Sequence, residues 1–282
     1  MNQELEIIRD QQQEVWNKFS AGWKKWDTLT MDFLKPVGDE MIRLLSPKNN
    51  DMVLDIASGT GEPGLTIAAM LTNGKVTLTD LSADMLEIAR QNGVDRGIKN
   101  IETLVCDVSE LPFEDNTFDI ISCRFGFMFF PDMQLAAKEM ARVLKPGGKV
   151  ATSVWSIPEK NFWITASMGV IQKNMDIPAP PSGAPGMFRC AKAGMMSDLF
   201  KEAGLTDISE KEIAGKMNCG TTDTYWNLMT DIAAPVVAAL SKADQAMKDK
   251  IKAEVYAAIN QKYPDGNVII DSSAIVVYAQ KK

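Results

Sequence analysis

None of the 282 residues of this chain is histidine. This absence excludes a histidine general base, a serine–histidine catalytic pair and a histidine-ligated metal. A general base, where the chemistry needs one, has to be an aspartate, glutamate, tyrosine, lysine or cysteine side chain, or the substrate itself. The four cysteines form no C-x-x-C pair, so we expect buried, reduced thiols and no metal site. They are Cys106, Cys123, Cys190 and Cys219.

Basic runs and long apolar runs are also missing. The net charge is −7 and no cluster of lysine and arginine stands out, which argues against tight binding to nucleic acid or to an anionic membrane. No apolar stretch approaches the roughly 18 residues that cross a bilayer. The N-terminal segment is polar and acidic, unlike a signal or transit peptide. We therefore expect no nucleic-acid partner, no membrane span and a cytoplasmic location.

Apolar runs and amphipathic segments do alternate along the chain. The apolar fraction of 45% and the charged fraction of 24% suit one large α/β domain, with or without a cap. Between residues 52 and 155 the alternation predicts parallel strands joined by right-handed helical crossovers. The predicted strands are 52–57, 75–79, 101–106, 118–123, 149–155, 205–213 and 267–279. The helices predicted between them are 64–71, 83–91, 131–144, 193–203, 223–240 and 242–263.

The first 46 residues are predicted to be helical and to form a separate lid. Residues 1–30 give one or two helices, and residues 31–46 give a further helix that begins after Pro36. An aromatic face with helical spacing marks the first segment, and it comprises Trp16, Phe19, Trp23 and Trp26. Two interpretations remain open: this face packs on the core, or it forms a lid whose aromatic side chains wall a substrate pocket.

A glycine turn follows the first predicted strand, and a helix follows the turn. Glycines let a ligand approach the backbone, and a helix N-terminus offers unpaired N–H groups, so this turn is a candidate cofactor site. The spacing Gly59-x-Gly61-x-x-Gly64, with Asp80 at a suitable distance for a ribose hydroxyl, fits a dinucleotide fingerprint. Asp55 inside the first strand could meet a cationic amino group, which NAD lacks. Asp107 ends the third strand, where it could accept a hydrogen bond from an adenine amino group.

With these motifs the sequence resembles the class I S-adenosylmethionine-dependent methyltransferases, and among them the ubiquinone/menaquinone-biosynthesis-like small-molecule group. The resemblance covers about residues 45–155, with weaker similarity to residue 210. It implies an α/β, doubly wound, mostly parallel seven-stranded Rossmann-like sheet whose last strand is antiparallel. The segments that carry it are 53–61 (VLDIASGTG), 80–86 (DLSADML), 106–108 (CDV), 111–113 (LPF), 118–121 (FDII) and 144–148 (LKPGG).

The resemblance also implies roles for individual residues. Those expected around the methionine part of the cofactor are Asp55, Gly59 and Gly61. Those expected at the adenosine are Asp80 on the ribose hydroxyls, Leu81 against the adenine, and Asp107 and Val108 at the adenine edge. Arg124 is expected on the path to the transferred methyl, and it is the single catalytic candidate. The chain departs from the family at Ala57, where a glycine is usual, and we expect a small shift of the loop with binding retained. It departs again in residues 1–30, which lack the family's N-terminal tyrosine.

The acceptor half of the site has no motif. We expect residues 156–190 to be an insertion over the site, and residues 222–263 to be a helical segment that also covers it, both within a methyltransferase domain of residues 47–282. The predicted function is methyl transfer from S-adenosylmethionine, with S-adenosylhomocysteine as product, to a small-molecule acceptor. An NAD(P)-dependent oxidoreductase and a non-catalytic S-adenosylmethionine-binding protein remain as alternatives. The acceptor atom and the oligomeric state are left open.

Overall fold

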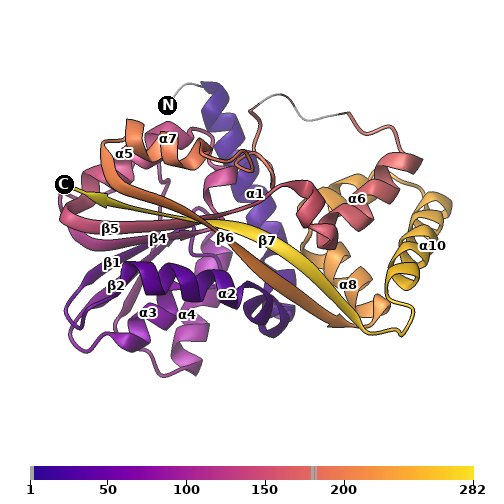
Figure 1. Ribbon diagram of the computed structural model, residues 1–282, viewed down its shortest axis with the longest axis horizontal. Helices are drawn as coiled ribbons and strands as arrows, with labels where there is room; N and C mark the ends of the chain where they lie inside the picture. The colour runs from indigo at the N-terminus through magenta and orange to yellow at the C-terminus, as the bar shows by residue number, and fades with distance from the viewer. Residues whose placement is uncertain (1–2, 179–180, 182) are drawn as a thin grey trace.

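The computed structural model describes residues 3–178, 181 and 183–282, and a seven-stranded sheet runs through it (Figure 1). The strand order is β3-β2-β1-β4-β5-β7-β6. The strands are β1 (Met52–Ile56), β2 (Lys75–Asp80), β3 (Ile101–Val105), β4 (Phe118–Arg124), β5 (Leu144–Trp155), β6 (Leu205–Gly220) and β7 (Val268–Lys281).

The directions of the strands confirm the predicted topology. The pairs β1–β2, β1–β4, β2–β3 and β4–β5 are parallel, whereas β7 runs antiparallel to both of its neighbours, β5 and β6. Helices cover both faces of the sheet, so a central strand such as β1 is apolar on both sides, and Val53, Leu54 and Ile56 are all buried. All five parallel strands therefore end at the same edge of the sheet, where the ligand of a doubly wound fold binds.

The helices pack in two layers. In Figure 1, α2 and α3 lie below the sheet and α5 and α7 lie above it. The helix α1 crosses the sheet edge and packs against α4 and α8. The α-helices are α1 (Gln3–Lys25), α2 (Asp27–Leu45), α3 (Gly64–Met70), α4 (Ala83–Asp95), α5 (Met133–Val143), α6 (Phe162–Asn174), α7 (Met195–Glu202), α8 (Thr222–Ile232), α9 (Ala234–Leu240) and α10 (Gln245–Lys262).

The predicted start of the second helix after Pro36 was wrong. The helix α2 begins at Asp27, and Pro36 lies inside it. A proline within a helix removes one backbone hydrogen bond, which costs about 3 kcal/mol. Here the apolar face of α2 is buried against β5, β6 and β7, and that burial outweighs the lost bond. The buried residues of this face include Phe33, Leu34, Val37, Met41 and Leu45.

Three further elements differ in length from the prediction. The strand β5 begins at Leu144 and not at residue 149, and β6 continues to Gly220 because it pairs with β7 along almost its whole length. The helix α4 continues past Asn92-Gly93 to Asp95, and a Cβ at Gly93 would lie 2.5 Å from Ile101 Cδ1. Residues 223–263 form three helices, α8, α9 and α10, where two were expected.

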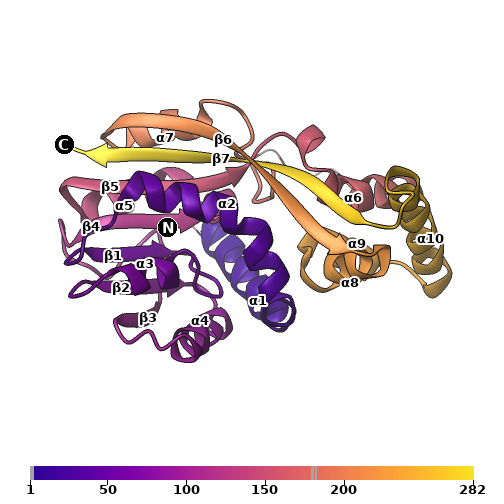
Figure 2. The same ribbon diagram turned by 60° about the horizontal axis from the view of Figure 1, so that its bottom comes forward.

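The antiparallel pair β6–β7 extends beyond the rest of the sheet. β5 pairs with β7 only from Ala274 onward, so residues 268–273 of β7 and their β6 partners project as a two-stranded arm. Helices α6, α8, α9 and α10 pack together at the end of this arm, and Figure 2 shows them as a lobe beside the main sheet. Helix α8 of this lobe packs against α1, so the lobe and α1 lie side by side.

Candidate functional site

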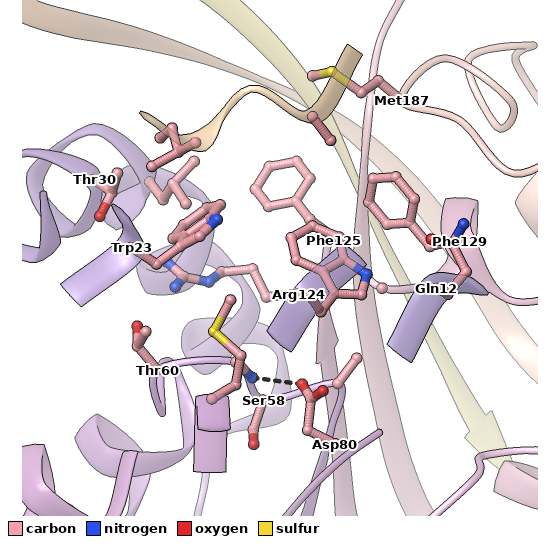
Figure 3. A pocket seen from close by; sticks show the side chains of 18 of the residues that line it. Gln12, Trp23, Thr30, Ser58, Thr60, Asp80, Arg124, Phe125, Phe129 and Met187 are labelled. Atoms are coloured by element: carbon pink, nitrogen blue, oxygen red, sulfur yellow. Dashed lines mark hydrogen bonds between the residues drawn. The ribbon is translucent and has the colours of Figure 1, made fainter. Parts of the chain in front are cut away.

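A pocket opens at the carboxyl ends of β1, β2, β3 and β4 (Figure 3). Its floor is the turn after β1, and its sides are the residues that follow the other three strands. The pocket is covered by α1, by α2 and by the junction of α8 and α9. The structure thus brings most of the predicted site residues together. Ala57, Gly59, Asp80, Leu81, Asp107, Val108 and Arg124 all line this pocket.

The turn after β1 has the conformation that glycine allows. Gly59 and Gly61 have φ angles of 53° and 113°, and the N–H of Gly61 donates to the carbonyl of Ser58. Ala57, which replaces a glycine of the family, has a φ of 51°. For a residue with a Cβ, this left-handed conformation is about 1–2 kcal/mol less favourable than a right-handed one. The alanine therefore takes up the glycine conformation under strain.

Asp80 ends β2 and faces the turn. Its Oδ2 accepts a hydrogen bond from the N–H of Gly59 at 2.9 Å (Figure 3), and its Oδ1 accepts one from the N–H of Ser82 at 2.9 Å. Burial raises the pKa of the Asp80 carboxyl, and these backbone N–H groups oppose the rise. The two bonds fix the orientation of the carboxylate, and each oxygen keeps acceptor capacity for a ligand.

Asp107 and Val108 follow β3 on the neighbouring side of the pocket. Oδ1 of Asp107 accepts a bond from the N–H of Ser109 at 2.8 Å, whereas its Oδ2 is buried and has no partner. A buried acceptor without a donor is costly, so this atom marks a place where a ligand donor fits. The buried side chain of Val108 offers an apolar surface beside it.

Two predicted cofactor residues, Asp55 and Gly61, do not line the pocket. Asp55 is fully buried behind the turn, where it accepts bonds from Ser122 Oγ at 2.5 Å and from the N–H of Gly64 at 3.0 Å. Burial raises the pKa of this carboxyl to about 7. Gly61 faces Leu65, because a Cβ on it would lie 2.6 Å from Leu65 Cδ1. Asp55 therefore supports the turn from the side away from the pocket, and Gly61 allows the turn to pack closely on Leu65.

Arg124 extends from the end of β4 into the other half of the pocket. The only hydrogen bond of its side chain within the described residues runs from Nη2 to Met31 Sδ at 3.7 Å. Burial lowers the pKa of the guanidinium, and the charges of Glu62, Asp55 and Asp27 oppose this. The cation therefore lies in the pocket and forms no direct ion pair with any residue that the structure describes.

Aromatic side chains surround Arg124 and give this half of the pocket an apolar character. The rings of Phe125 and Trp155 stack with centroids 4.2 Å apart, and Trp163 lies 4.9 Å from Trp155. Met187 also lines the pocket, so both Trp163 and Met187 from the predicted insertion 156–190 reach it. Residues 179, 180 and 182 of that insertion lie outside the described residues. No sequence motif had singled out these side chains.

The helix α1 covers the pocket and is fastened by polar contacts. Gln13 Nε2 donates to the carbonyl of Leu81 at 2.8 Å, and Ser82 Oγ donates to Asn17 Oδ1 at 2.6 Å. Of the predicted aromatic face, Trp16 and Trp23 line the pocket, Phe19 is buried elsewhere, and Trp26 Nε1 donates to Asp231 of α8. Part of this aromatic face therefore packs in the protein interior, and part of it forms a wall of the pocket.

Glu62 lines the pocket and had not been predicted. It directly follows Gly61, accepts a hydrogen bond from the N–H of Thr66 at 3.2 Å and forms an ion pair with Arg96. Its position at the start of the helix after the glycine turn was the available signal.

The four cysteines are free. Among the described residues, no helix is long and apolar enough to span a membrane, and no cluster of acidic residues and cysteines could hold a metal ion.

Comparison with known proteins places the chain among methyltransferases. The model of the ubiE/COQ5 methyltransferase family matches residues 9–168, which is more than half of the chain. The ubiquinone/menaquinone biosynthesis C-methyltransferase UbiE of Cellvibrio japonicus is 45% identical over 112 residues, covering 39% of this chain and 45% of that protein. The demethylmenaquinone methyltransferase of Bacillus subtilis is 33% identical over 153 residues, covering 52% of this chain and 66% of that protein.

The chain thus spans about half to two thirds of these two curated relatives. Among solved structures, the YcgJ protein of Bacillus subtilis has the same fold, with a TM-score of 0.59 and 20% identity over 87% of this chain and 97% of that one. The family match covers most of α1, the glycine turn and the ends of β1 to β4, which line the end of the pocket that contains Asp80 and Asp107. The chain therefore belongs to the ubiE/COQ5 methyltransferase family.

Proposed function

We propose that this protein transfers a methyl group from S-adenosylmethionine to a small, apolar acceptor with a quinone-type ring, releasing S-adenosylhomocysteine. The observation that carries the proposal is the pair of aspartates at the ends of β2 and β3. Asp80 is held by two backbone N–H groups and Asp107 has a buried, unpaired oxygen, and both face one pocket.

The residues present fit an adenosine at this end of the pocket. In the proposed arrangement Asp80 accepts the ribose hydroxyls, Asp107 Oδ2 accepts the adenine amino group, and Leu81 and Val108 pack on the ring. Gly59 and Ala57 belong to the neighbouring turn and line the pocket there. In the proposed arrangement the cofactor's amino-acid end runs past this turn towards Arg124. Asp55 and Gly61 support the turn and act on the cofactor only through it.

The other half of the pocket suits a flat apolar acceptor. Phe33, Phe125, Trp155 and Trp163 form one packed aromatic cluster at its wall, with ring centroids 4.2–5.7 Å apart. Aromatic rings favour stacked or edge-on contact with another ring. The curated relatives named above are methyltransferases of ubiquinone and menaquinone biosynthesis, which agrees with an acceptor of this shape.

The bound cofactor supplies a methyl group on a positively charged sulfur, which is already reactive towards a nucleophile. The protein's task is then to align the acceptor and to exclude water, and proximity provides much of the rate. The cover formed by α1, α2 and the α8–α9 junction, together with the aromatic wall, excludes water. The absence of histidine from the chain agrees with a reaction that depends on positioning.

The proposal is tested with S-adenosylmethionine that carries a deuterated methyl group. The protein is incubated with this donor and with quinol, phenol, amine and carboxylate acceptors, and products are detected by mass spectrometry. We expect labelled product from an apolar quinol or phenol. Binding of S-adenosylhomocysteine without turnover on any acceptor would instead identify a cofactor-binding protein, and tight binding of NAD without a response to S-adenosylhomocysteine would identify a dehydrogenase.

A further inference from the structure

The helix α1 is fastened to two different parts of the molecule. In its middle, Gln13 and Asn17 bond to the residues directly before α4, at the proposed adenosine end of the pocket. At its C-terminal end, α1 packs against α8 of the helical lobe. There Asp231 Oδ2 accepts a hydrogen bond from Trp26 Nε1 at 2.8 Å and one from Lys25 Nζ at 2.7 Å. One carboxylate oxygen of the lobe thus holds the end of α1.

The two helices approach each other closely at this point. A Cβ on Gly22 of α1 would lie 2.5 Å from the carbonyl oxygen of Asp231 and 3.2 Å from Ile232 Cγ2. The Nζ of Lys25 also lies 5.0 Å from the centroid of the Trp26 ring. Lys25, Trp26 and Asp231 therefore form one cluster, which we call the clasp.

The stability of α8 alone does not account for Asp231. This residue lies in the last turn of α8, where the negative end of the helix dipole disfavours an acidic side chain. The cation of Lys25, which comes from α1, compensates this charge. The family match ends at residue 168, so Asp231 belongs to a part of the chain outside that match. Its contacts instead serve the junction between α1 and the helical lobe.

The clasp lies between two walls of the half of the pocket that is proposed to hold the acceptor. On α1, Trp23 lines the pocket, and Figure 3 shows it beside Arg124 and away from Asp80. On the lobe, residues 232–235 follow Asp231 directly and line the pocket as well. The seam between α1 and the α8–α9 junction therefore closes this half of the pocket, and the clasp fixes the distance between its two walls.

We propose that Asp231 is a positioning residue for methyl transfer, which holds α1 and the helical lobe together over the acceptor. The inference rests on the proposed function, because it takes this half of the pocket to bind the acceptor. Asp231 itself does not line the pocket, so it acts through Trp23 and residues 232–235. Walls that stay in place keep the acceptor aligned with the methyl group and keep water out.

Three substitutions change the clasp in different ways. Asp231→Ala removes both bonds, whereas Asp231→Asn removes the ion pair and keeps an oxygen that accepts from Trp26 Nε1. Gly22→Ala keeps the three side chains and forces the helices apart, although alanine is the better helix former. The matched control is Asp223→Ala, because Asp223 lies on the same helix and accepts a bond from Tyr256 Oη of α10 at 2.6 Å, inside the lobe.

The first measurement is hydrogen exchange of the free protein, read by mass spectrometry on peptides from residues 16–30 and 222–235. Loss of hydrogen bonds to a charged group lowers the free energy of local opening. We expect Asp231→Ala to raise the exchange rate in the last turn of α1 by about fivefold, and Asp223→Ala to leave it unchanged. Because no ligand is present, this measurement does not depend on the proposed function.

The second measurement is calorimetric binding of 2-naphthol, a flat apolar phenol, in the presence of S-adenosylhomocysteine. We expect Asp231→Ala and Gly22→Ala to weaken 2-naphthol by about fivefold, Asp231→Asn by about twofold, and Asp223→Ala not at all. The affinity for S-adenosylhomocysteine should stay within twofold in every variant, because α1 remains fastened beside α4. A general loss of structure would weaken both ligands, so this difference between them distinguishes positioning from stability.

The proposal is overturned if Asp231→Ala and Asp223→Ala give the same exchange rate in α1 or the same affinity for 2-naphthol. It is also overturned if Asp231→Ala weakens S-adenosylhomocysteine as much as 2-naphthol. If the wild-type protein does not bind 2-naphthol, it is the proposed acceptor that fails, and hydrogen exchange still decides whether Asp231 holds α1 to the lobe.

Discussion

Replacing Asp80 with alanine separates the two roles that the structure gives this residue. In the free protein its carboxylate holds the N–H groups of Gly59 and Ser82, each at 2.9 Å. Hydrogen bonds to a charged group contribute about 1.5–3 kcal/mol each, and part of this is offset because the carboxylate is itself buried. We expect Asp80→Ala to lower the free energy of unfolding by about 2–4 kcal/mol. Chemical denaturation without ligand measures this loss.

The same substitution also removes the proposed partner of the ribose hydroxyls. We expect the affinity for S-adenosylhomocysteine to fall by about 1.5–3 kcal/mol, which is about 10- to 150-fold, as calorimetry would measure. A fall of this size, well beyond calorimetric error, would support Asp80 as a direct ligand of the cofactor.

Asp119→Ala provides the matched control. Asp119 accepts a bond from the N–H of Met52 at 2.8 Å and pairs with Lys145, both at the opposite end of β1. This variant should lose stability and keep its affinity for S-adenosylhomocysteine. If the two variants bind S-adenosylhomocysteine within twofold of each other, the assignment of Asp80 to the cofactor is refuted.

Three further outcomes follow from the structure. Asn161→Ala should lower the free energy of unfolding by about 3 kcal/mol or more in denaturant titrations. The reason is that the two hydrogens of the buried amide are shared among three carbonyls and its oxygen accepts from two donors, one of them Trp163 Nε1; a change below about 1 kcal/mol would contradict this. Arg43 and Lys211 hold the pKa of Glu40 at about 2, so its contribution to stability is complete above the usual value of 4.5 and is lost as the pH falls towards 2. Glu40→Gln should therefore flatten the stability profile in that acid range, and an unchanged profile would rule the pair out. Four of the six tryptophans line the pocket, so S-adenosylhomocysteine should alter the intrinsic fluorescence in a saturable way, whereas NAD should not.

Pocket residues at the ends of the parallel strands could be predicted from sequence because the signal for each of them is local. A buried parallel strand reads as an apolar run, and the residue directly after it lies at the ligand-binding edge of the sheet. Asp80 and Asp107 were identified in this way, and Arg124 was identified through the family resemblance; all three line the pocket. Asp55 lies inside a strand, where the direction of its side chain depends on helix packing. The structure turns it towards Gly64 and Ser122, behind the turn.

The acceptor half could not be predicted because distant segments build it. Trp155 ends β5, Trp163 lies in the first turn of α6 and Met229 belongs to α8, and they meet only through the packing of the helical lobe. No local pattern encodes such a meeting. The start of α2 was misjudged for a related reason, since a local rule about Pro36 is weaker than the burial of the whole helix face. The length of β6 likewise depends on its pairing with β7.

The central claim is that the pocket at the ends of β1 to β4 holds S-adenosylmethionine. A crystal structure of the protein with S-adenosylhomocysteine tests it most directly. The account predicts density for the adenosine with its ribose hydroxyls on Asp80 and its amino group on Asp107, and with the amino-acid end running past Gly59 towards Arg124. An adenosine bound elsewhere, or a pocket that stays empty at saturating S-adenosylhomocysteine, would contradict it.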